Sequence, residues 1–91
     1  MAELSDYKHV HCIGIGGIGL SAIAEIFLKK GLWVSGSDLK PGEITDKLKN
    51  MGALIFSEHA ESNIRGADLV VYSSAVSPDN PELTAALRNG I

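Results

Sequence analysis

The chain has 91 residues, a length that allows one domain, and its formal net charge at pH 7 is −3. Hydrophobic residues make up 45% of it and charged residues 21%, which excludes a disordered chain and is typical of a globular protein. The negative charge lacks the basic footprint of nucleic-acid-binding proteins, so we expect no nucleic-acid partner.

The cellular location is predicted from the cysteine content and from the apolar runs. The single cysteine, Cys12, excludes an intramolecular disulfide and fits a reducing compartment. Residues 1–6 have neither the basic nor the apolar region of a signal peptide. No apolar run approaches the roughly 20 residues of a membrane span. We therefore expect a cytoplasmic protein without membrane association.

The first half of the chain alternates strand and helix patterns. A β-type run at 9–14 enters a glycine cluster, and a helix is predicted over 17–30, with Gly31 as its stop. A second strand is predicted at 32–37 and a short helix at 45–50. In the first helix Ile18, Ile23, Ile26 and Phe27 lie at helical spacing.

The same alternation continues to the end of the chain. A third strand is predicted at 53–56 and at most one helical turn at 61–64. The run at 67–72 is the most apolar and β-branched, so we expect a central strand that is buried on both faces. Pro81 is typical of a first helical turn, and the last helix is predicted over 82–88.

The order β-α-β-α-β-(α)-β-α predicts an α/β fold, a Rossmann-like parallel sheet with flanking helices, in one domain over 1–91. No strand pattern follows the last helix, although a fold of this kind would deliver that helix into another strand. We therefore expect that the sequence is an excised part of a longer protein, with a natural small domain as the alternative.

A glycine motif joins the first strand to the first helix. Residues 14–19 (GIGGIG) match G-x-G-x-x-G in the strand–loop–helix context that binds diphosphates. We interpret Gly14 as the tight turn, Gly16 as the point of close approach to a pyrophosphate, and Gly19 as the contact that lets the helix pack near the sheet. The helix N-terminus would add free N–H groups and a partial positive charge. A tight turn without a ligand is the alternative.

Polar residues at the ends of the other strands extend this candidate site, because ligands bind beyond the carboxyl ends of parallel strands. Asp38 follows Gly19 by 19 residues, the spacing of the acid that binds a ribose hydroxyl, although a turn-capping aspartate is the alternative. The further candidates are Ser21, Ser37, His59, Ser73, Ser74, Ala75 and Asn80. The plain alternatives are a helix-surface serine for Ser21, an exposed loop side chain for His59 and a helix cap for Asn80.

No metal site and no catalytic group is expected. His9 and His11 alternate along one strand and should point to one face, but no acid or cysteine lies at ligand spacing beside them. Cys12 lies inside the same strand, so we interpret it as a buried, inert thiol.

Four separated motifs give the chain, from about residue 9 to 87, a resemblance to the Mur ligase family. They are HCIGIGGIGLS at 11–21, VSGSD at 34–38, SSA at 73–75 and NPE at 80–82. The departures are Cys12, Leu20 and Ala22, where the family often has a bulky apolar residue, Met and Gly. These changes affect packing beside the glycine motif and remove no phosphate contact.

The resemblance implies a UDP-sugar-binding domain of an ATP-dependent ligase of peptidoglycan synthesis, with UDP-N-acetylmuramate as its ligand. On that basis the amides of Gly16, Gly17 and Ile18 would bind the diphosphate, and Asp38 would bind the ribose or the uracil edge. The uridine side would be lined by His59, Ser73, Ser74 and Ala75, with Asn80 at its rim. Family members that attach L-alanine and those that attach a recycled peptide share this nucleotide sugar.

The resemblance also implies what these 91 residues do not contain. Mur ligases have a central ATPase domain with a P-loop and a C-terminal domain for the incoming amino acid, so ATP and Mg²⁺ belong to the full-length enzyme. The fragment alone should hold its substrate without a cofactor and without turnover. The alternative is an NAD-binding domain of a dehydrogenase or redox-sensing regulator, which would equally have the glycine motif and Asp38 but has no stated need for SSA and NPE.

Overall fold

The computed structural model describes residues 7–91, and the leader prediction for residues 1–6 lies outside them. The elements are β1 (His9–Ile13), α1 (Ile18–Lys29), β2 (Trp33–Ser37), α2 (Glu43–Asn50), β3 (Leu54–Phe56), η2 (Glu61–Ile64), β4 (Leu69–Tyr72) and α3 (Pro81–Arg88). The predicted order of elements is confirmed. Their boundaries lie within two residues of the prediction, because glycine and proline mark most of the element ends.

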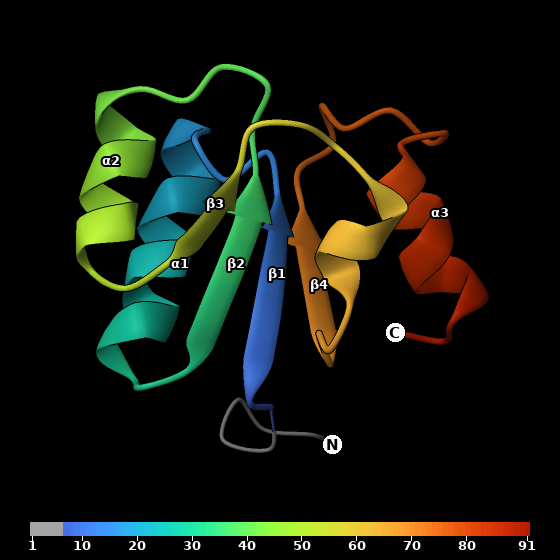
Figure 1. Ribbon diagram of the computed structural model, residues 1–91, viewed down its shortest axis with the longest axis horizontal. Coiled ribbons are helices and arrows are strands. Elements are labelled where there is room, and N and C mark those ends of the chain that lie inside the picture. The colour runs from blue at the N-terminus through green and yellow to red at the C-terminus, as the bar shows by residue number, and fades with distance from the viewer. Residues whose placement is uncertain (1–6) are drawn as a thin grey trace.

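The four strands form one parallel sheet in the order β3-β2-β1-β4. Figure 1 shows α1 and α2 on one side of this sheet, and η2 and α3 on the other. The α/β class with a parallel sheet is therefore confirmed. In such a sheet all strands end at one edge, and the glycine motif and the polar strand ends meet there.

The prediction of a central strand at 67–72 is wrong. β4 lies at the edge of the described sheet, and its side chains are half-buried or exposed. β1 has the interior position, and Val10 to Ile13 are fully buried within it. An apolar composition indicates that the two faces of a strand are covered by other elements. It does not determine whether the strand pairs on one edge or on both.

The main core lies between the sheet and the α1–α2 layer. Val10, Cys12 and Val34 project into it from β1 and β2. The helices contribute Leu20, Ala24, Phe27 and Leu48. Cys12 is fully buried, and burial raises the pKa of its thiol to about 12, as an inert core thiol requires.

Of the apolar residues at helical spacing in α1 that the sequence singled out, only Phe27 is buried. Ile18 is 85% exposed, and Ile23 and Ile26 are exposed as well. α1 has apolar residues around most of its circumference, so the periodicity allows more than one buried stripe. Packing against β1 and β2 selects the stripe that contains Leu20 and Ala24.

Two glycines have roles that the backbone geometry explains. Gly14 has φ +79°, which supports its interpretation as the tight turn after β1. Gly36 is the point of close packing, because a Cβ there would lie 2.5 Å from Cδ1 of Ile15 and 2.9 Å from the carbonyl oxygen of Cys12. The interpretation of Gly19 as the close-packing residue is wrong, since a Cβ there would meet no described atom within 4 Å.

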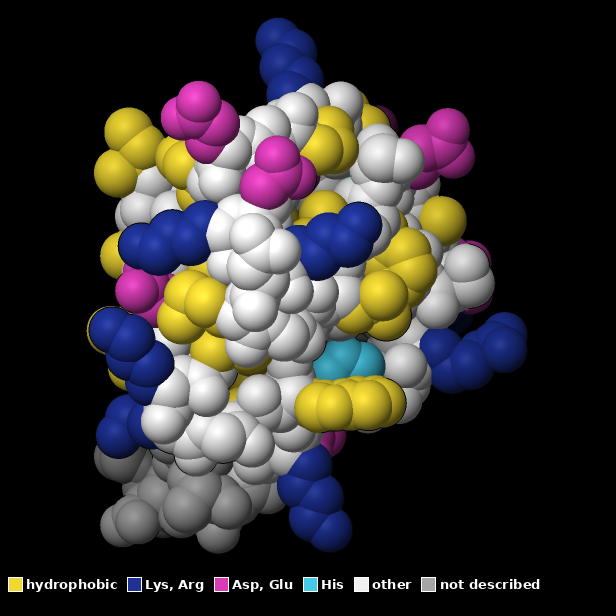
Figure 2. All heavy atoms as spheres, turned by 60° about the vertical axis from the view of Figure 1, so that its left-hand side comes forward, with side chains coloured by type: hydrophobic (Ala, Val, Ile, Leu, Met, Phe, Trp, Pro, Cys, Tyr) yellow, Lys and Arg dark blue, Asp and Glu magenta, His cyan; other side chains and the backbone are white. Residues whose placement is uncertain are grey.

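The outer surface mixes charged and apolar side chains. In Figure 2 the exposed hydrophobic side chains lie in separate groups with Lys, Arg, Asp and Glu between them. Trp33 and Leu54, at the starts of β2 and β3, are 76% and 59% exposed. Among residues 7–91 no helix is long and apolar enough to cross a membrane.

Candidate functional site

A cleft of about 710 Å³ opens at the carboxyl ends of the strands. It is lined by Gly14, Gly17, Asp38, Leu39, Lys40, His59, Ser73, Ala75, Val76, Ser77 and Asn80. Seven of the predicted site residues are in this lining, although they come from five separate parts of the chain. The cleft therefore lies where the strand-end rule predicts a ligand.

The N-terminus of α1 lies beside the cleft. The amide of Ser21 makes the first hydrogen bond of the helix, to the carbonyl of Gly17 at 2.8 Å. Gly17 provides no side-chain cap, so within the described chain the amides of Ile18, Gly19 and Leu20 have no helical acceptor. These N–H groups, together with the helix dipole, attract an anion.

The glycine loop uses two of the amides predicted for a diphosphate. Gly16 donates its N–H to Oδ2 of Asp38 at 2.9 Å, and Gly17 donates its N–H to the carbonyl of Gly14 at 3.0 Å. Two of the three amides predicted to bind the diphosphate therefore already have acceptors inside the described chain. Of the three amides predicted for the diphosphate, only that of Ile18 has no acceptor within the described chain, because Asp38 accepts from Gly16 and the carbonyl of Gly14 accepts from Gly17.

Asp38 joins the glycine loop to the turn after β2. Its second oxygen, Oδ1, accepts the N–H of Lys40 at 2.8 Å. A Cβ at Gly16 would lie 2.6 Å from Oδ2, so Gly16 is required for the approach of this carboxylate. The side chain of Lys40 provides a cation in the cleft lining, although Lys40 is not among the residues predicted for the site.

A buried carboxylate, Glu82, lies behind the cleft. Its Oε1 accepts hydrogen bonds from Nε2 of His11 at 2.5 Å and from Oγ of Ser37 at 2.7 Å. Its Oε2 accepts from the N–H of Ala60 at 3.0 Å and from Nδ2 of Asn63 at 2.9 Å. The side chain has no exposed surface. Four donors from three parts of the chain thus satisfy one buried acid.

The charge state of Glu82 follows from two opposing effects. Burial raises the pKa of its carboxyl, but hydrogen bonds from His11, Ser37 and Asn63 outweigh it and lower the pKa from 4.5 to about 2. The carboxyl is therefore ionised at neutral pH. Glu82 is not among the residues predicted for the site from the sequence. The available signal was the H-x-H and S-x-S alternation in β1 and β2, which predicts a polar face that needs a partner.

The polar face of the sheet continues from Glu82 in two directions. Ser37 is fully buried, and its hydroxyl also lies 2.8 Å from Nδ1 of His59. Ser37, which was predicted as a nucleoside contact, has both hydrogen-bonding directions of its hydroxyl used inside the protein. On the other side, His9 and His11 each lie 2.7 Å from Oγ of Ser35, which confirms that both point to one face.

The remaining predicted residues divide between capping and exposed positions. Oδ1 of Asn80 caps α3 by accepting from the amides of Glu82 and Leu83 at 2.9 and 3.4 Å, and Asn80 also lines the cleft. Ser21 donates to the carbonyl of Ile18 at 3.0 Å, the plain helix-surface alternative. Gly16, Ile18, Gly19, Ser21, Ser37 and Ser74 lie outside the cleft lining.

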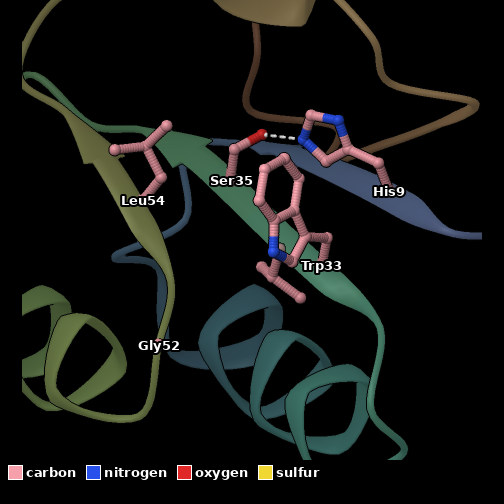
Figure 3. A pocket seen from close by; sticks show the side chains of 6 residues that line it. His9, Trp33, Ser35, Gly52 and Leu54 are labelled. Atoms are coloured by element: carbon pink, nitrogen blue, oxygen red, sulfur yellow. Dashed lines mark hydrogen bonds between the residues drawn. The ribbon is translucent and has the colours of Figure 1, made fainter.

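A second hollow, of about 230 Å³, lies on the sheet face near the starts of β1 and β2. Figure 3 shows His9, Trp33, Ser35 and Leu54 around it, with the hydrogen bond between His9 and Ser35. Its lining is mainly apolar, and it contains none of the predicted site residues. No group of three or more His, Cys, Asp or Glu side chains that could hold a metal occurs in residues 7–91.

Comparison with known proteins identifies the family. The model of the Mur ligase family, catalytic domain, matches residues 9–91. The chain belongs to the Mur ligase family. The family resemblance found in the four motifs is thereby confirmed, and the NAD-binding alternative has no support.

The Mur ligases most similar in sequence include two UDP-N-acetylmuramate–L-alanine ligases. The enzyme of Chlorobium luteolum is 56% identical over 90 residues, which are 98% of this chain and 19% of that protein. The enzyme of Clostridium tetani is 60% identical over 84 residues, which are 92% of this chain and 18% of that protein. This Mur ligase chain thus spans about a fifth of the length of these curated relatives.

Solved Mur ligase structures have the same fold. The UDP-N-acetylmuramate–alanine ligase of Thermotoga maritima matches with a TM-score of 0.87 and 39% identity, over 93% of this chain and 20% of that chain. The UDP-N-acetylmuramate:L-alanyl-γ-D-glutamyl-meso-diaminopimelate ligase of Neisseria meningitides matches with a TM-score of 0.83 and 28% identity, over 92% and 27%.

Proposed function

We propose that this chain is the N-terminal substrate-binding domain of a UDP-N-acetylmuramate–L-alanine ligase and that its cleft holds the UDP part of UDP-N-acetylmuramate. The observation that carries the proposal is the position of the cleft, at the carboxyl ends of four parallel strands and beside the uncapped N-terminus of α1. A nucleoside diphosphate matches this arrangement, because its phosphates need N–H donors and its nucleoside needs a polar wall.

The diphosphate would bind at the start of α1. Ile18 keeps its predicted role there, and the amides of Gly19 and Leu20 would join it as further donors. Lys40, which lines the cleft, would add a positive charge on the side of β2. Gly14 and Gly17 would let the backbone approach the phosphates, since neither has a side chain in the way.

The nucleoside would bind farther along the strand ends. Asp38 would accept a ribose hydroxyl while its oxygens hold the glycine loop and the turn after β2. His59, Ser73 and Ala75 would line the uridine side, and Asn80 would form its rim. Ser74 is exposed on the same loop, next to the lining but outside it.

The chemistry of the whole ligase would need parts beyond this chain. The resemblance implies that ATP forms an acyl phosphate on the muramic carboxylate, which the amine of L-alanine then attacks. A P-loop sequence does not occur in the 91 residues, so we assign ATP and Mg²⁺ to a central domain of a longer protein and L-alanine to its C-terminal domain. In this proposal residues 1–91 form one substrate-binding domain in the cytoplasm, and they are inactive alone.

The sequence identities to two relatives favour L-alanine over a recycled peptide as the attacking group. The relatives that are 56% and 60% identical are named as L-alanine ligases. The enzyme with a tripeptide in its name is 28% identical. The cleft itself does not distinguish these members, because they share the nucleotide sugar.

The test is a titration of the ¹⁵N-labelled chain with UDP-N-acetylmuramate, UDP and NAD, followed by amide chemical shifts. We expect shifts with the first two at residues 17–20, 38–40 and 73–76, and none around Trp33 and Leu54 in the second hollow. Stronger shifts with NAD than with UDP would refute the ligase assignment. Shifts with none of the three would refute nucleotide binding by this chain alone.

A further inference from the structure

We infer that Glu82 and Ser37 are positioning residues for His59: they fix its tautomer so that Nδ1 carries the proton and Nε2 accepts a hydrogen bond from the nucleoside. The inference rests on the proposed function, because the nucleoside is the ligand proposed for the cleft. Neither residue would touch the ligand, since both side chains are fully buried. They would act through the imidazole that lines the cleft.

The direction of the hydrogen bonds follows from the carboxylate. Ionised Glu82 only accepts, so the hydroxyl of Ser37, with Oγ 2.7 Å from Oε1, must donate to it. The oxygen of Ser37 is then left as the acceptor for Nδ1 of His59 at 2.8 Å. Nδ1 must therefore carry a hydrogen. Oε2 of Glu82 lies 3.5 Å from the same nitrogen and favours that proton electrostatically.

The other ring nitrogen is available to a ligand. In a neutral imidazole the nitrogen without a proton is an acceptor. No buried side-chain nitrogen or oxygen lacks a partner among residues 7–91, and the hydrogen bonds found there do not use Nε2 of His59. Nε2 is therefore solvent-accessible, on a side chain that is 20% exposed and lines the cleft. The matching ligand group is a hydrogen-bond donor, and uridine offers ribose hydroxyls and the imide N–H.

Glu82 also fixes the main chain on both sides of the imidazole. Its Oε2 accepts the N–H of Ala60, the residue after His59. The same oxygen accepts from Nδ2 of Asn63, which also donates to the carbonyl of Glu58, the residue before His59. One carboxylate on α3 therefore holds the ring orientation and the loop that presents the ring. If Glu82 only stabilised the fold, its contact with Ser37 and its contacts with Ala60 and Asn63 would not need to lie on one side chain.

The test compares two serines that lie two residues apart on β2 and are both buried. Ser37→Ala removes the hydroxyl between Glu82 and His59. Ser35→Ala removes the hydroxyl that contacts His9 and His11 on the same face, and it leaves the contacts of His59 in place. The ¹⁵N shifts of the two ring nitrogens report the tautomer, and they are measured at pH 8, above the range in which histidine ordinarily titrates. UDP affinity is measured by titration of each folded variant.

We expect the native chain and Ser35→Ala to show His59 protonated at Nδ1 and to bind UDP within about twofold of each other. Ser37→Ala should shift His59 toward protonation at Nε2 and bind UDP about tenfold more weakly. If Ser37→Ala does not fold, Glu82→Gln serves instead. The amide of Gln at position 82 can donate to Ser37 and so free the hydroxyl to donate to Nδ1.

The possible results separate this inference from the proposed function. A native His59 protonated at Nε2 overturns the inference whether or not UDP binds. UDP affinity that is equal in the native chain and in Ser37→Ala also overturns it, and the proposed function then survives. No UDP binding by the native chain overturns the proposed function and the ligand contact inferred from it.

Analogues of UDP identify the donor on the nucleoside. A 2′-deoxyribose and a 3′-deoxyribose each remove one hydroxyl, and an N3-methyl group removes the imide N–H. We expect one of the three analogues to bind the native chain about tenfold more weakly than UDP and to lose this difference in Ser37→Ala. Equal binding of UDP and all three analogues by the native chain would overturn the inferred acceptor role of Nε2.

Discussion

The carboxylate of Asp38 and the amide of Gly16 form a hydrogen bond of 2.9 Å that joins the end of β2 to the glycine loop. A glycine at position 16 thus serves the protein's own carboxylate before any ligand arrives. In the sequence the glycine loop resembles a phosphate-binding loop whose amides are all free, but in the structure Asp38 already accepts one of these N–H groups. The donors that are left lie one step farther along, at the start of α1.

Gly16→Ala should weaken UDP binding about tenfold, or about 1.4 kcal/mol, with little loss of stability. The new Cβ would lie 2.6 Å from Oδ2 of Asp38 and 3.2 Å from Cγ2 of Thr45, so the flexible carboxylate must move and lose its amide contact. Isothermal titration with UDP measures the affinity. Gly42→Ala, which lies outside the cleft lining and whose Cβ would meet no described atom within 4 Å, is the control for an added methyl group. An unchanged UDP affinity in Gly16→Ala would show that UDP binding does not require the hydrogen bond between Gly16 and Asp38.

Gly36→Ala should lower the free energy of unfolding by about 1–3 kcal/mol. Its Cβ would lie 2.6 Å from Cβ of Ile15 and 2.9 Å from the carbonyl oxygen of Cys12, and neither group is a flexible side-chain end. For stability, Gly19→Ala is the matched control, because its Cβ would meet no described atom within 4 Å. Urea unfolding of the two variants gives the comparison. Equal stability of the two would contradict the assignment of close packing to Gly36.

Lys40→Ala should weaken UDP binding about threefold to tenfold and reduce its dependence on salt. The side chain lines the cleft, and screening by salt weakens an exposed charge–phosphate attraction. Lys30→Ala removes an exposed lysine at the opposite end of α1 and should leave the affinity unchanged. Titrations at two ionic strengths measure both effects. An equal salt dependence in the native chain and Lys40→Ala would exclude this lysine as a phosphate contact.

Acid should destabilise the fold through Glu82. Its pKa is lowered from 4.5 to about 2 by folding, so its contribution is fully present above pH 4.5 and is lost as the pH falls toward 2. The difference corresponds to about 3 kcal/mol. Urea unfolding at pH 7, 4 and 3 measures it. The pKa of Asp68 is also lowered, although burial opposes the amide hydrogen bonds from Lys8 and His9, so the native chain retains a second acid-sensitive contribution.

Glu82→Gln separates the acid-dependent stability that comes from Glu82 from that of Asp68. This variant keeps the shape of the side chain and cannot ionise at position 82. It should be less stable than the native chain at pH 7, and the difference between the two should shrink between pH 4 and 3. A stability difference that stays constant over this range would contradict the lowered pKa of Glu82.

The sequence by itself determined the order of the elements and the sheet edge at which the candidate site lies. Gly14, Gly31 and Gly52 mark the ends of β1, α1 and α2 with positive φ angles, a local requirement that sequence reading recognises directly. The rule that ligands bind at strand ends is equally local. It brought His59, Ser73 and Asn80 into one prediction, and all three line the cleft.

Only the tertiary structure decided which atoms are free to bind. Glu82 is 71 residues from His11 in the sequence, and no local pattern states that the two side chains meet at 2.5 Å. A second long-range hydrogen bond of Glu82 uses the hydroxyl of Ser37, and Asp38 uses the amide of Gly16 in the same way. The position of a polar residue in the sequence, for example at the end of a strand, determines on which part of the fold it lies. Because every buried hydrogen-bonding group must find a partner, packing across the chain determines which of these groups remain for a ligand.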